Sequence, residues 1–599
     1  MNHAQNTLAA ATPQPLLEEA LACHRRGELR HAEALYQAIL RDAPENTDAL
    51  HLLGVMACQI GKHEAALGFF ERAIKTAPGW AILYCSRGVA LKALRQYARA
   101  IESFDRAVAL DARYADAYYN RANLYMQIKR FDCALADYER VEQLQGGHDY
   151  LEGQRLFAQA SIFDWSDFAA RRRRLEEQIA QGRKAIGPFF LLALSGEAAM
   201  QKRAAEIYVE NECPAPEERM RFAQHAPREK IRIGYFSPDF RAHAIGYLTA
   251  EIFERHDRDR FEIYGFSYGP QTGDAVERRI AAAMDQFLEV GSRSDEQIAS
   301  LGREFEIDVA IDLAGHTFGG RPKIFAYGAA PVQVSYLGHP GTSGAPYIDY
   351  LLADERLIPA AQREFYTEKI AYLPDCFQPT DTRQLVAATE TTRADEGLPE
   401  SGFVYCCFNN GCKIQPEVFD LWMEILLGVE GSVLWLAEEN ERARNNLRRE
   451  AVARGLSAER LVFCRRVSAA EHLSRQRLAD LFLDTYPFNA GATANSALWA
   501  GLPVLTRGGE VFASRMGMSL LHALKIPELI AGSAEQYVER AVALGHAPQR
   551  IAELKARLRQ SRSASPLYEM RRFTRNLESL YSAMHARAQA GLPAEHLFV

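Results

Sequence analysis

A 34-residue repeat organises the first quarter of this chain. Alanines recur at that spacing at Ala32, Ala66, Ala100 and Ala134. An aromatic residue follows each alanine by four positions, at Tyr36, Phe70, Phe104 and Tyr138. A third class of small residues keeps the same spacing, at Ala20, Gly54, Gly88 and Ala122. Small residues let paired helices approach closely and the aromatic ring fills the space between them, so the repeat predicts stacked helix pairs.

The spacing is that of tetratricopeptide repeats, with units predicted at 13–46, 47–80, 81–114 and 115–148. Pro44 and Pro78 end the first two units, whereas Ala112 stands where a third proline would be. The alternative is a helical bundle that repeats by chance, which three position classes over four units argue against. A solenoid of this kind offers a concave groove, which predicts that a peptide or protein partner binds there.

Charge gives no reason to expect nucleic acid or an anionic membrane as a partner. The 599 residues carry a net charge of −7, with 25% charged and 48% hydrophobic residues. The one concentrated basic run, Arg171–Arg174, is followed by Glu176 and Glu177. We therefore interpret that run as a solvated helix face.

Targeting and metal-binding patterns are also missing from the sequence. No apolar stretch is long enough to span a bilayer, and Met1–Pro13 lacks the features of a signal peptide, so we expect a cytoplasmic protein. The ten cysteines form no CxxC pair, and no Asp-x-Asp set stands in a strand context. We expect neither a metal site nor a cofactor.

After the repeats, the sequence predicts a helical connector at 149–228 and then two α/β lobes. Apolar runs predict strands at 231–236, 261–267, 307–313, 332–337 and 349–353. A polar stretch at 387–402 predicts a hinge, and a second series of strands follows at 403–408, 432–437, 460–463, 480–483 and 503–506. Strands alternating with helices indicate parallel sheets. We therefore expect two Rossmann-like lobes, at 229–386 and 403–590, with a cleft between them.

Ligands of such sheets lie beyond the carboxyl ends of the strands, so the loops there are the candidates for chemistry. In the first lobe these are 237–243, 313–320 and 337–344, of which the last two are rich in glycine. His243 has two interpretations at this stage: an acid or base facing the cleft, or a helix cap.

The second lobe offers a cation and a helix N-terminus. Lys413 follows the strand at 403–408, where its ammonium could neutralise a leaving phosphate, although a lysine on a loop is more often solvated. Gly491, Ala492 and Thr493 begin a predicted helix, whose free backbone N–H groups and dipole favour a diphosphate.

Four motifs give the chain a family resemblance: Ser237–His243, Gly338–Gly344, Phe408–Lys413 and Leu498–Val504. Together with the repeats they resemble the O-linked N-acetylglucosamine transferases, whose plant relatives include SPINDLY-type enzymes. The resemblance implies an inverting, metal-independent transferase with the two-lobed GT-B fold. It would move N-acetylglucosamine from UDP-N-acetylglucosamine to Ser or Thr of a protein that the repeat groove binds.

The resemblance also assigns site residues. His243 matches the histidine proposed as the catalytic base, and Lys413 matches the lysine that stabilises the leaving nucleotide. The residues expected to bind the donor are His339, Pro340, Gly341, Thr342, Asn410, His472, Gly491, Ala492 and Thr493.

The chain departs from the animal enzymes at several points. The long insertion between the lobes is absent, and a glutamine beside Lys413 is Asn410. A ribose-contacting lysine is Ala469 here, a Gly-His-Thr-Thr run is Ala490–Thr493, and an aspartate near the ribose is Ser496. These changes leave two alternatives open. One is a transferase that uses another donor, such as GDP-fucose or a flagellin sugar, and the other is a repeat adaptor whose transferase core has decayed.

Overall fold

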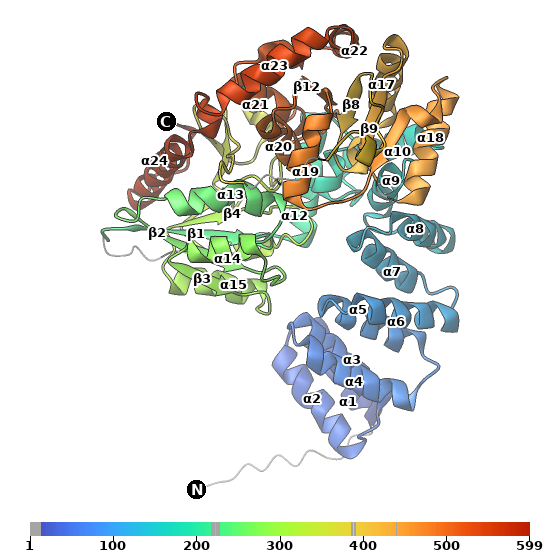
Figure 1. Ribbon diagram of the computed structural model, residues 1–599. Coiled ribbons are helices and arrows are strands. Elements are labelled where there is room, and N and C mark those ends of the chain that lie inside the picture. The colour runs from blue at the N-terminus through green and yellow to red at the C-terminus, as the bar shows by residue number, and fades with distance from the viewer. Residues whose placement is uncertain (1–12, 217–221, 223–227, 385–386, 388–390, 439) are drawn as a thin grey trace. The chain divides into compact units, whose positions relative to one another are not determined.

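A computed structural model describes residues 13–216, 222, 228–384, 387, 391–438 and 440–599. The chain divides into two compact units, Met1–His148 and Asp149–Val599. Figure 1 shows the first unit as a stack of blue helices and the second as an α/β body coloured from teal to red. Most of the predicted hinge, 387–402, is described, but 388–390 lie outside the described residues.

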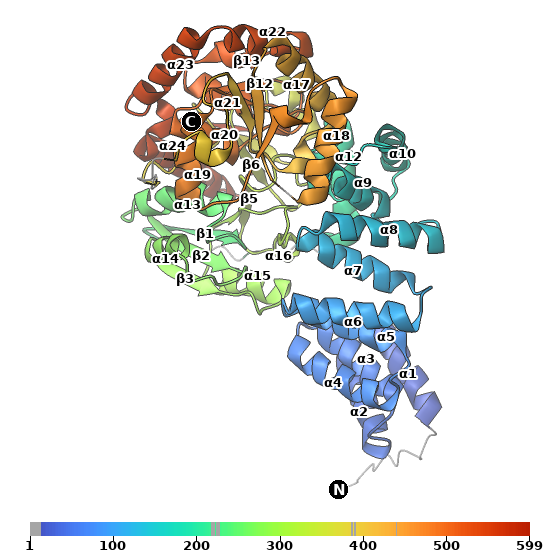
Figure 2. The same cartoon turned by 45° about the vertical axis from the view of Figure 1, so that its right-hand side comes forward.

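The first unit consists of four antiparallel helix pairs, seen from a second side in Figure 2. Their bounds are α1 Pro13–Arg25, α2 Leu29–Asp42, α3 Thr47–Gln59, α4 His63–Thr76, α5 Ala81–Ala93, α6 Tyr97–Leu110, α7 Ala115–Gln127 and α8 Phe131–Gln145. The repeated alanines and aromatic rings are buried without exception. A Cβ at Gly54 or Gly88 would overlap the ring of Phe70 or Phe104, which explains the glycines.

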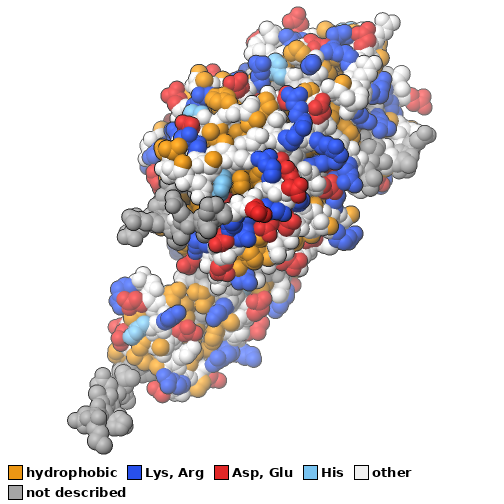
Figure 3. Space-filling model, turned by 90° about the vertical axis from the view of Figure 1, so that its left-hand side faces the viewer, with side chains coloured by type: hydrophobic (Ala, Val, Ile, Leu, Met, Phe, Trp, Pro, Cys, Tyr) orange, Lys and Arg blue, Asp and Glu red, His pale blue; other side chains and the backbone are white. Residues whose placement is uncertain are grey.

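A helical connector opens the second unit, with α9 Leu151–Ser161, α10 Phe168–Ala180, α11 Pro188–Leu191 and α12 Ala198–Glu212. The basic run lies on α10, where Arg171 pairs with Asp167 at 2.5 Å and Arg172 with Glu417 at 2.6 Å. Arg171 is buried and Arg172 half-buried, whereas Arg173 and Arg174 are exposed, so only the second half of the run is a solvated helix face. Elsewhere, positive and negative side chains are interspersed over the face shown in Figure 3.

The first lobe is built on an eight-stranded parallel sheet with the order β14-β7-β6-β5-β4-β1-β2-β3. Its strands are β1 Ile231–Ser237, β2 Phe261–Ser267, β3 Gln286–Glu289, β4 Val309–Asp312, β5 Val332–Ser335, β6 Tyr350–Ala353, β7 Lys369–Tyr372 and β14 Leu597–Phe598. One apolar core joins the sheet to α13 Ala244–Arg255, α14 Ala275–Ala282 and α24 Met570–Gln589. A second core joins it to α15 Asp295–Glu304 and α16 Lys323–Ala326. The sheet is therefore covered by helices on both faces.

The second lobe has a six-stranded parallel sheet with the order β10-β9-β8-β11-β12-β13. Its strands are β8 Val404–Cys407, β9 Val433–Ala437, β10 Leu461–Cys464, β11 Leu481–Leu483, β12 Val504–Arg507 and β13 Ile530–Ala531. The helices are α17 Pro416–Gly428, α18 Glu441–Ala453, α19 Ala469–Arg475, α20 Ala492–Ala500, α21 Met516–Ala523, α22 Ala534–Gly545 and α23 Pro548–Ser561. The short turn η3, Gly411–Lys413, follows β8.

The chain ends by returning to the first lobe, where α24 packs against α13 and the sheet (Figure 1). The buried Tyr581 hydroxyl lies 3.2 Å from that of Tyr235, and Glu578 lies 2.9 Å from His256 Nδ1. The lobes are also joined directly, because Ser519 of α21 donates to buried Asp354 at 2.5 Å. Two links therefore connect the second lobe to the first: helix α24, and the hydrogen bond from Ser519 to Asp354.

The two-lobed α/β fold and the repeat solenoid are as the sequence predicts, and all ten predicted strands are present. The sequence analysis missed four strands: β3, β7, β13 and β14. Three of these lie at a sheet edge or are two residues long, so each gives little apolar pattern. In the described part of the chain, no helix has the length and apolarity needed to cross a membrane.

Candidate active site

Three loops meet where β1, β4 and β5, which are neighbours in the sheet, end. Glycines permit their close approach. Gly315 has φ +55°, and a Cβ there would lie 2.7 Å from His339 Cβ. A Cβ at Gly338 would overlap the backbone of Leu313 and Ala314. The glycine-rich loops predicted from sequence therefore pack directly on one another.

His339 and His316 form the centre of this group, with ring centroids 5.1 Å apart. His339 is buried, and burial together with His316 lowers its pKa well below the usual value. Burial also lowers the pKa of His316 to about 4, although Ser343 O accepts its Nε2–H at 2.7 Å. Both rings are therefore neutral at pH 7. The Nδ1 atoms of both are buried without a hydrogen-bond partner among the described residues. His316 carries its proton on Nε2, so its Nδ1 can only accept a hydrogen bond.

The rest of the loop after β5 is ordered by hydrogen bonds to one buried carboxylate. Thr342 Oγ1 donates to buried Glu368 at 2.7 Å, and Ser343 N donates to the same carboxylate at 2.6 Å. Pro340 and Gly341 are buried beside them. The Thr342 hydroxyl thus orders the loop, and the position of Pro340 and Gly341 depends on it.

His243 is the N-cap of α13, and its Nδ1 accepts a hydrogen bond from Ile245 N at 3.4 Å. The same nitrogen lies 3.5 Å from Asp239 Oδ2, and 41% of the side chain is exposed. The capping interpretation is therefore correct in geometry. It does not exclude chemistry, because Nδ1 can instead carry the proton and face the Asp239 carboxylate, which makes Nε2 the basic nitrogen.

Lys413 closes the turn after β8, and its ammonium donates to Asn489 O at 2.8 Å. The Nζ atom also lies 3.5 Å from the centre of the Phe488 ring. Burial lowers the pKa of Lys413 to about 8, and the neighbouring Cys412 and Asp484 side chains oppose that shift. The cation is held by a carbonyl and a ring rather than by a carboxylate ion pair, so an anion can still bind it.

The N-terminus of α20 begins directly after that loop. Gly491 is its N-cap, and Ala492 and Thr493 are its first residues, all half-buried. Behind them, buried Asp484 accepts from Ala490 N at 2.7 Å and from Thr506 Oγ1 at 2.7 Å. Burial raises the pKa of Asp484 to about 6. The sequence analysis did not single out Asp484, although a lone aspartate after an apolar strand was a usable signal.

His472 and Asn410 lie near the same strand end in different environments. The His472 ring is 4.9 Å from Phe408, the residue that follows β8. Burial and the Arg475 guanidinium lower the pKa of His472 to about 4, and Arg475 Nε donates to its Nδ1 at 3.2 Å. The neutral ring therefore carries its proton on Nε2. Asn410 is exposed, and its side chain caps nothing.

Phe189 of the connector joins the groups of the two lobes. Its ring centroid lies 6.4 Å from that of His339 and 6.1 Å from that of Phe488. The Phe488 ring is the one that the Lys413 ammonium contacts. Gln378 also reaches across, because its buried and unpartnered Oε1 lies 4.0 Å from the Cβ position of Gly491. Sequence reasoning missed both residues, since neither stands at a strand end.

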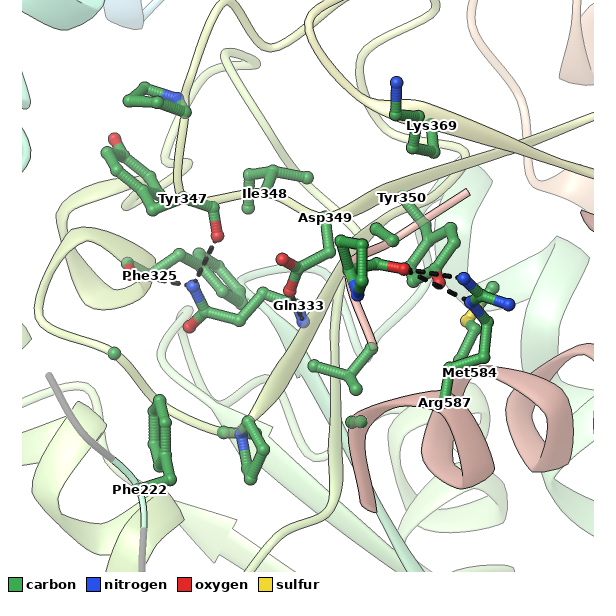
Figure 4. A pocket seen from close by; sticks show the side chains of 18 of the residues that line it. Phe222, Phe325, Gln333, Tyr347, Ile348, Asp349, Tyr350, Lys369, Met584 and Arg587 are labelled. Carbon is green, nitrogen blue, oxygen red and sulfur yellow. Dashed lines mark hydrogen bonds between the residues drawn. The ribbon is translucent and has the colours of Figure 1, made fainter. Parts of the chain in front are cut away.

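A cavity of about 560 Å³ lies at the opposite edge of the first sheet (Figure 4). Gln333, Asp349, Tyr350 and Lys369, among its lining residues, stand at the amino ends of β5, β6 and β7. The Gln333 amide is bonded to the carbonyls of Phe325 and Tyr347 and so supports the wall. Size alone therefore does not mark the functional site of a parallel sheet.

The second-lobe group has the composition of an anion site. A protonated amine, the free N–H groups of a helix N-terminus and the neutral Nε2–H of a histidine are all donors. No three His, Cys, Asp or Glu side chains gather as a metal site within the residues that the structure describes. Together these donors suit a diphosphate.

Four family models account for most of the chain. The model of glycosyl transferase family 41 matches residues 162–390 and 386–577. The chain belongs to that family. Models of tetratricopeptide repeats match 17–79 and 115–148, and a TPR repeat model matches 90–129.

Relatives of this family member are named as peptide N-acetylglucosaminyltransferases. The probable UDP-N-acetylglucosamine–peptide N-acetylglucosaminyltransferase SEC of Arabidopsis thaliana is 35% identical over 62% of this chain and 39% of its own length. The corresponding Caenorhabditis elegans enzyme is 27% identical over 73% of this chain and 49% of its own. A SPINDLY protein of Petunia hybrida is 29% identical over 60% of this chain and 39% of its own. The matches thus span less than half of these relatives.

A solved structure matches nearly the whole chain. It is an O-GlcNAc transferase mutant from Thermobaculum terrenum, with a TM-score of 0.61 and 28% identity. The match covers 98% of this chain and 100% of that one. The match therefore extends over both the repeat solenoid and the two α/β lobes of this chain.

Proposed function

We propose that this glycosyltransferase moves N-acetylglucosamine from UDP-N-acetylglucosamine to Ser or Thr of a protein acceptor, with inversion at the anomeric carbon. The observation that carries the proposal is Lys413, whose ammonium lies 2.8 Å from Asn489 O in the loop that leads into α20. An ammonium and a helix N-terminus together bind the diphosphate and meet the charge that grows on it as it leaves. The names of the relatives supply the donor and the peptide acceptor.

In the proposed reaction the acceptor oxygen forms a bond to the anomeric carbon while the bond from that carbon to the β-phosphate oxygen breaks. UDP leaves with the electron pair, and Lys413 and the α20 N–H groups bind its charge. His243 Nε2 receives the hydroxyl proton in the tautomer whose proton is on Nδ1; that proton then points to Asp239, 3.5 Å away, in place of the bond from Ile245 N. The repeat groove would hold the acceptor protein.

The nucleotide is the least constrained part of this proposal. Ala469 and Ser496 present neither an ammonium nor a carboxylate where the animal enzymes contact the ribose. The test is therefore a transfer assay that offers UDP-N-acetylglucosamine and GDP-fucose to a peptide library, with the product identified by mass and the anomer by NMR. Transfer of N-acetylglucosamine as the β-anomer is expected.

Transfer of fucose alone would show that the donor is GDP-fucose and not UDP-N-acetylglucosamine. Failure of both sugars, together with failure of UDP and GDP to bind, would favour the adaptor alternative. Loss of transfer in Lys413→Ala, but not in the exposed Lys230→Ala, would place the chemistry at this site.

A further inference from the structure

A second groove lies beside the proposed active site, in the angle between the connector and the loop after β4. It has a volume of about 340 Å³, within the range of ligand pockets. Four of its aromatic residues are Tyr150, Phe190, Tyr208 and Phe318. Phe318 is 48% exposed. Nothing in the proposed transfer step uses this aromatic groove.

The rings are arranged as walls rather than packed into a core. Tyr150 and Tyr208 have centroids 5.7 Å apart with a tilt of 59°, and Phe190 and Phe318 have centroids 5.3 Å apart with a tilt of 52°. All four rings line the groove, so aromatic surface forms much of its wall. The faces of aromatic rings carry negative potential and attract cations.

Glu212 adds a negative charge to the same groove. It is half-buried, and its Oε1 accepts the Tyr150 hydroxyl at 3.1 Å. It is also the last residue of α12, so the negative end of that helix dipole adds to its charge. Among the residues that line the groove there is no lysine or arginine to neutralise it.

The groove lies within reach of the reacting hydroxyl. Phe189 lines the groove and also contacts Phe488, and the Phe488 ring in turn contacts the Lys413 ammonium. One aromatic ring thus separates the groove from the diphosphate site. An extended peptide advances about 3.3 Å per residue, so a side chain a few positions from the acceptor Ser or Thr spans this separation.

We propose that the aromatic groove binds a lysine or arginine side chain of the acceptor protein, a few residues from the glycosylated Ser or Thr. The aromatic lining, and a carboxylate with no lysine or arginine among the lining residues, complement a cation on an aliphatic stem. The inference rests on the proposed function, because it assigns the specificity of that same site. It adds a recognition element that acts at the peptide and leaves the donor untouched.

The test uses the full chain and fluorescent Ser peptides that carry lysine, norleucine or glutamate at each position within about five residues of the serine. At one or two positions, lysine is expected to lower KM at least tenfold relative to norleucine. Glu212→Gln is expected to reduce that ratio to about two, without changing the UDP affinity. Glu210→Gln, an exposed neighbour on the same helix, is the matched control and should keep the ratio.

Equal KM values for lysine and norleucine at every position, or a lysine preference that survives both Glu212→Gln and Tyr208→Leu, would overturn the subsite. Peptide binding measured by anisotropy separates this failure from failure of the proposed function. Lysine-dependent binding that Glu212→Gln weakens, without transfer of any sugar, would retain the subsite and remove the transferase assignment.

Discussion

The repeat unit and the catalytic unit use the same types of contact over very different sequence distances. In the repeat unit, Gly54 faces Phe70 of the same helix pair, and the pattern returns in the next pair with Gly88 and Phe104. In the catalytic unit, Lys413 meets Asn489 76 positions away, and Tyr235 meets Tyr581 346 positions away. The contacts of the first unit can therefore be predicted from its repeat spacing, whereas those of the second unit are set by which distant loops the fold brings together.

The largest effect expected is on the stability of the repeat unit. Phe70→Ala removes a fully buried ring and should lower the local free energy of unfolding of α3 and α4 by about 3–5 kcal/mol. Hydrogen exchange followed by mass spectrometry on peptides from 47–80 measures it. Peptides from β8 and β9 should exchange as before, because contacts in a solenoid are between neighbours.

Gly54→Ala sharpens this prediction as a double-mutant cycle with Phe70→Ala. A Cβ at Gly54 overlaps the Phe70 ring, so Gly54→Ala alone should destabilise the pair. In the Phe70→Ala background the same methyl group occupies vacated space and should cost less. Additive effects would mean that the two residues are not in contact.

The next largest effect is a loss of catalytic rate with no loss of stability. Lys413→Ala should lower kcat by about 10²–10³-fold, since it removes one of the groups that stabilise the departing diphosphate. The melting temperature should stay within about 2 °C, because Lys413 makes one hydrogen bond, to a carbonyl, and a contact with one ring. A variant that retains full kcat would contradict the role given to this lysine.

His243→Asn separates the two interpretations of His243. Asparagine is a good N-cap and can accept from Ile245 N, but it has no basic nitrogen at the place of Nε2. We expect kcat to fall about 100-fold with α13 intact and UDP affinity unchanged. A fall of less than about threefold would show that the residue is a cap alone.

Asp484→Asn is expected to cause a smaller change, in the pH dependence of UDP binding. Asparagine can accept from Ala490 N and contact Thr506 Oγ1, so the loop should keep its shape. Loss of the negative charge should lower the pKa of Lys413, and the pH at which UDP affinity begins to fall should drop by roughly half a unit. Glu424→Gln, exposed on α17 of the same lobe, should leave that pH unchanged.

These contrasts also explain what the sequence could predict. The strand ends at Lys413, Gly491 and His339 were predictable, because a parallel sheet brings its loops to one edge. Phe189 and Gln378 were not, since they reach the site from the connector and from the segment after β7, and only the folded chain places them there. The hydrogen bond from Thr342 to Glu368 was hidden for the same reason.

The central claim, that Lys413 holds the diphosphate, is tested most directly by calorimetric titration with UDP from pH 6 to 10. The pKa of Lys413 is about 8, and a bound diphosphate raises it. Binding therefore needs the protonated amine: affinity should be constant below about pH 8 and fall up to tenfold per unit above it. Lys413→Arg should abolish that fall, because its guanidinium stays charged throughout. A UDP affinity that falls equally in both proteins, or in neither, would contradict the account.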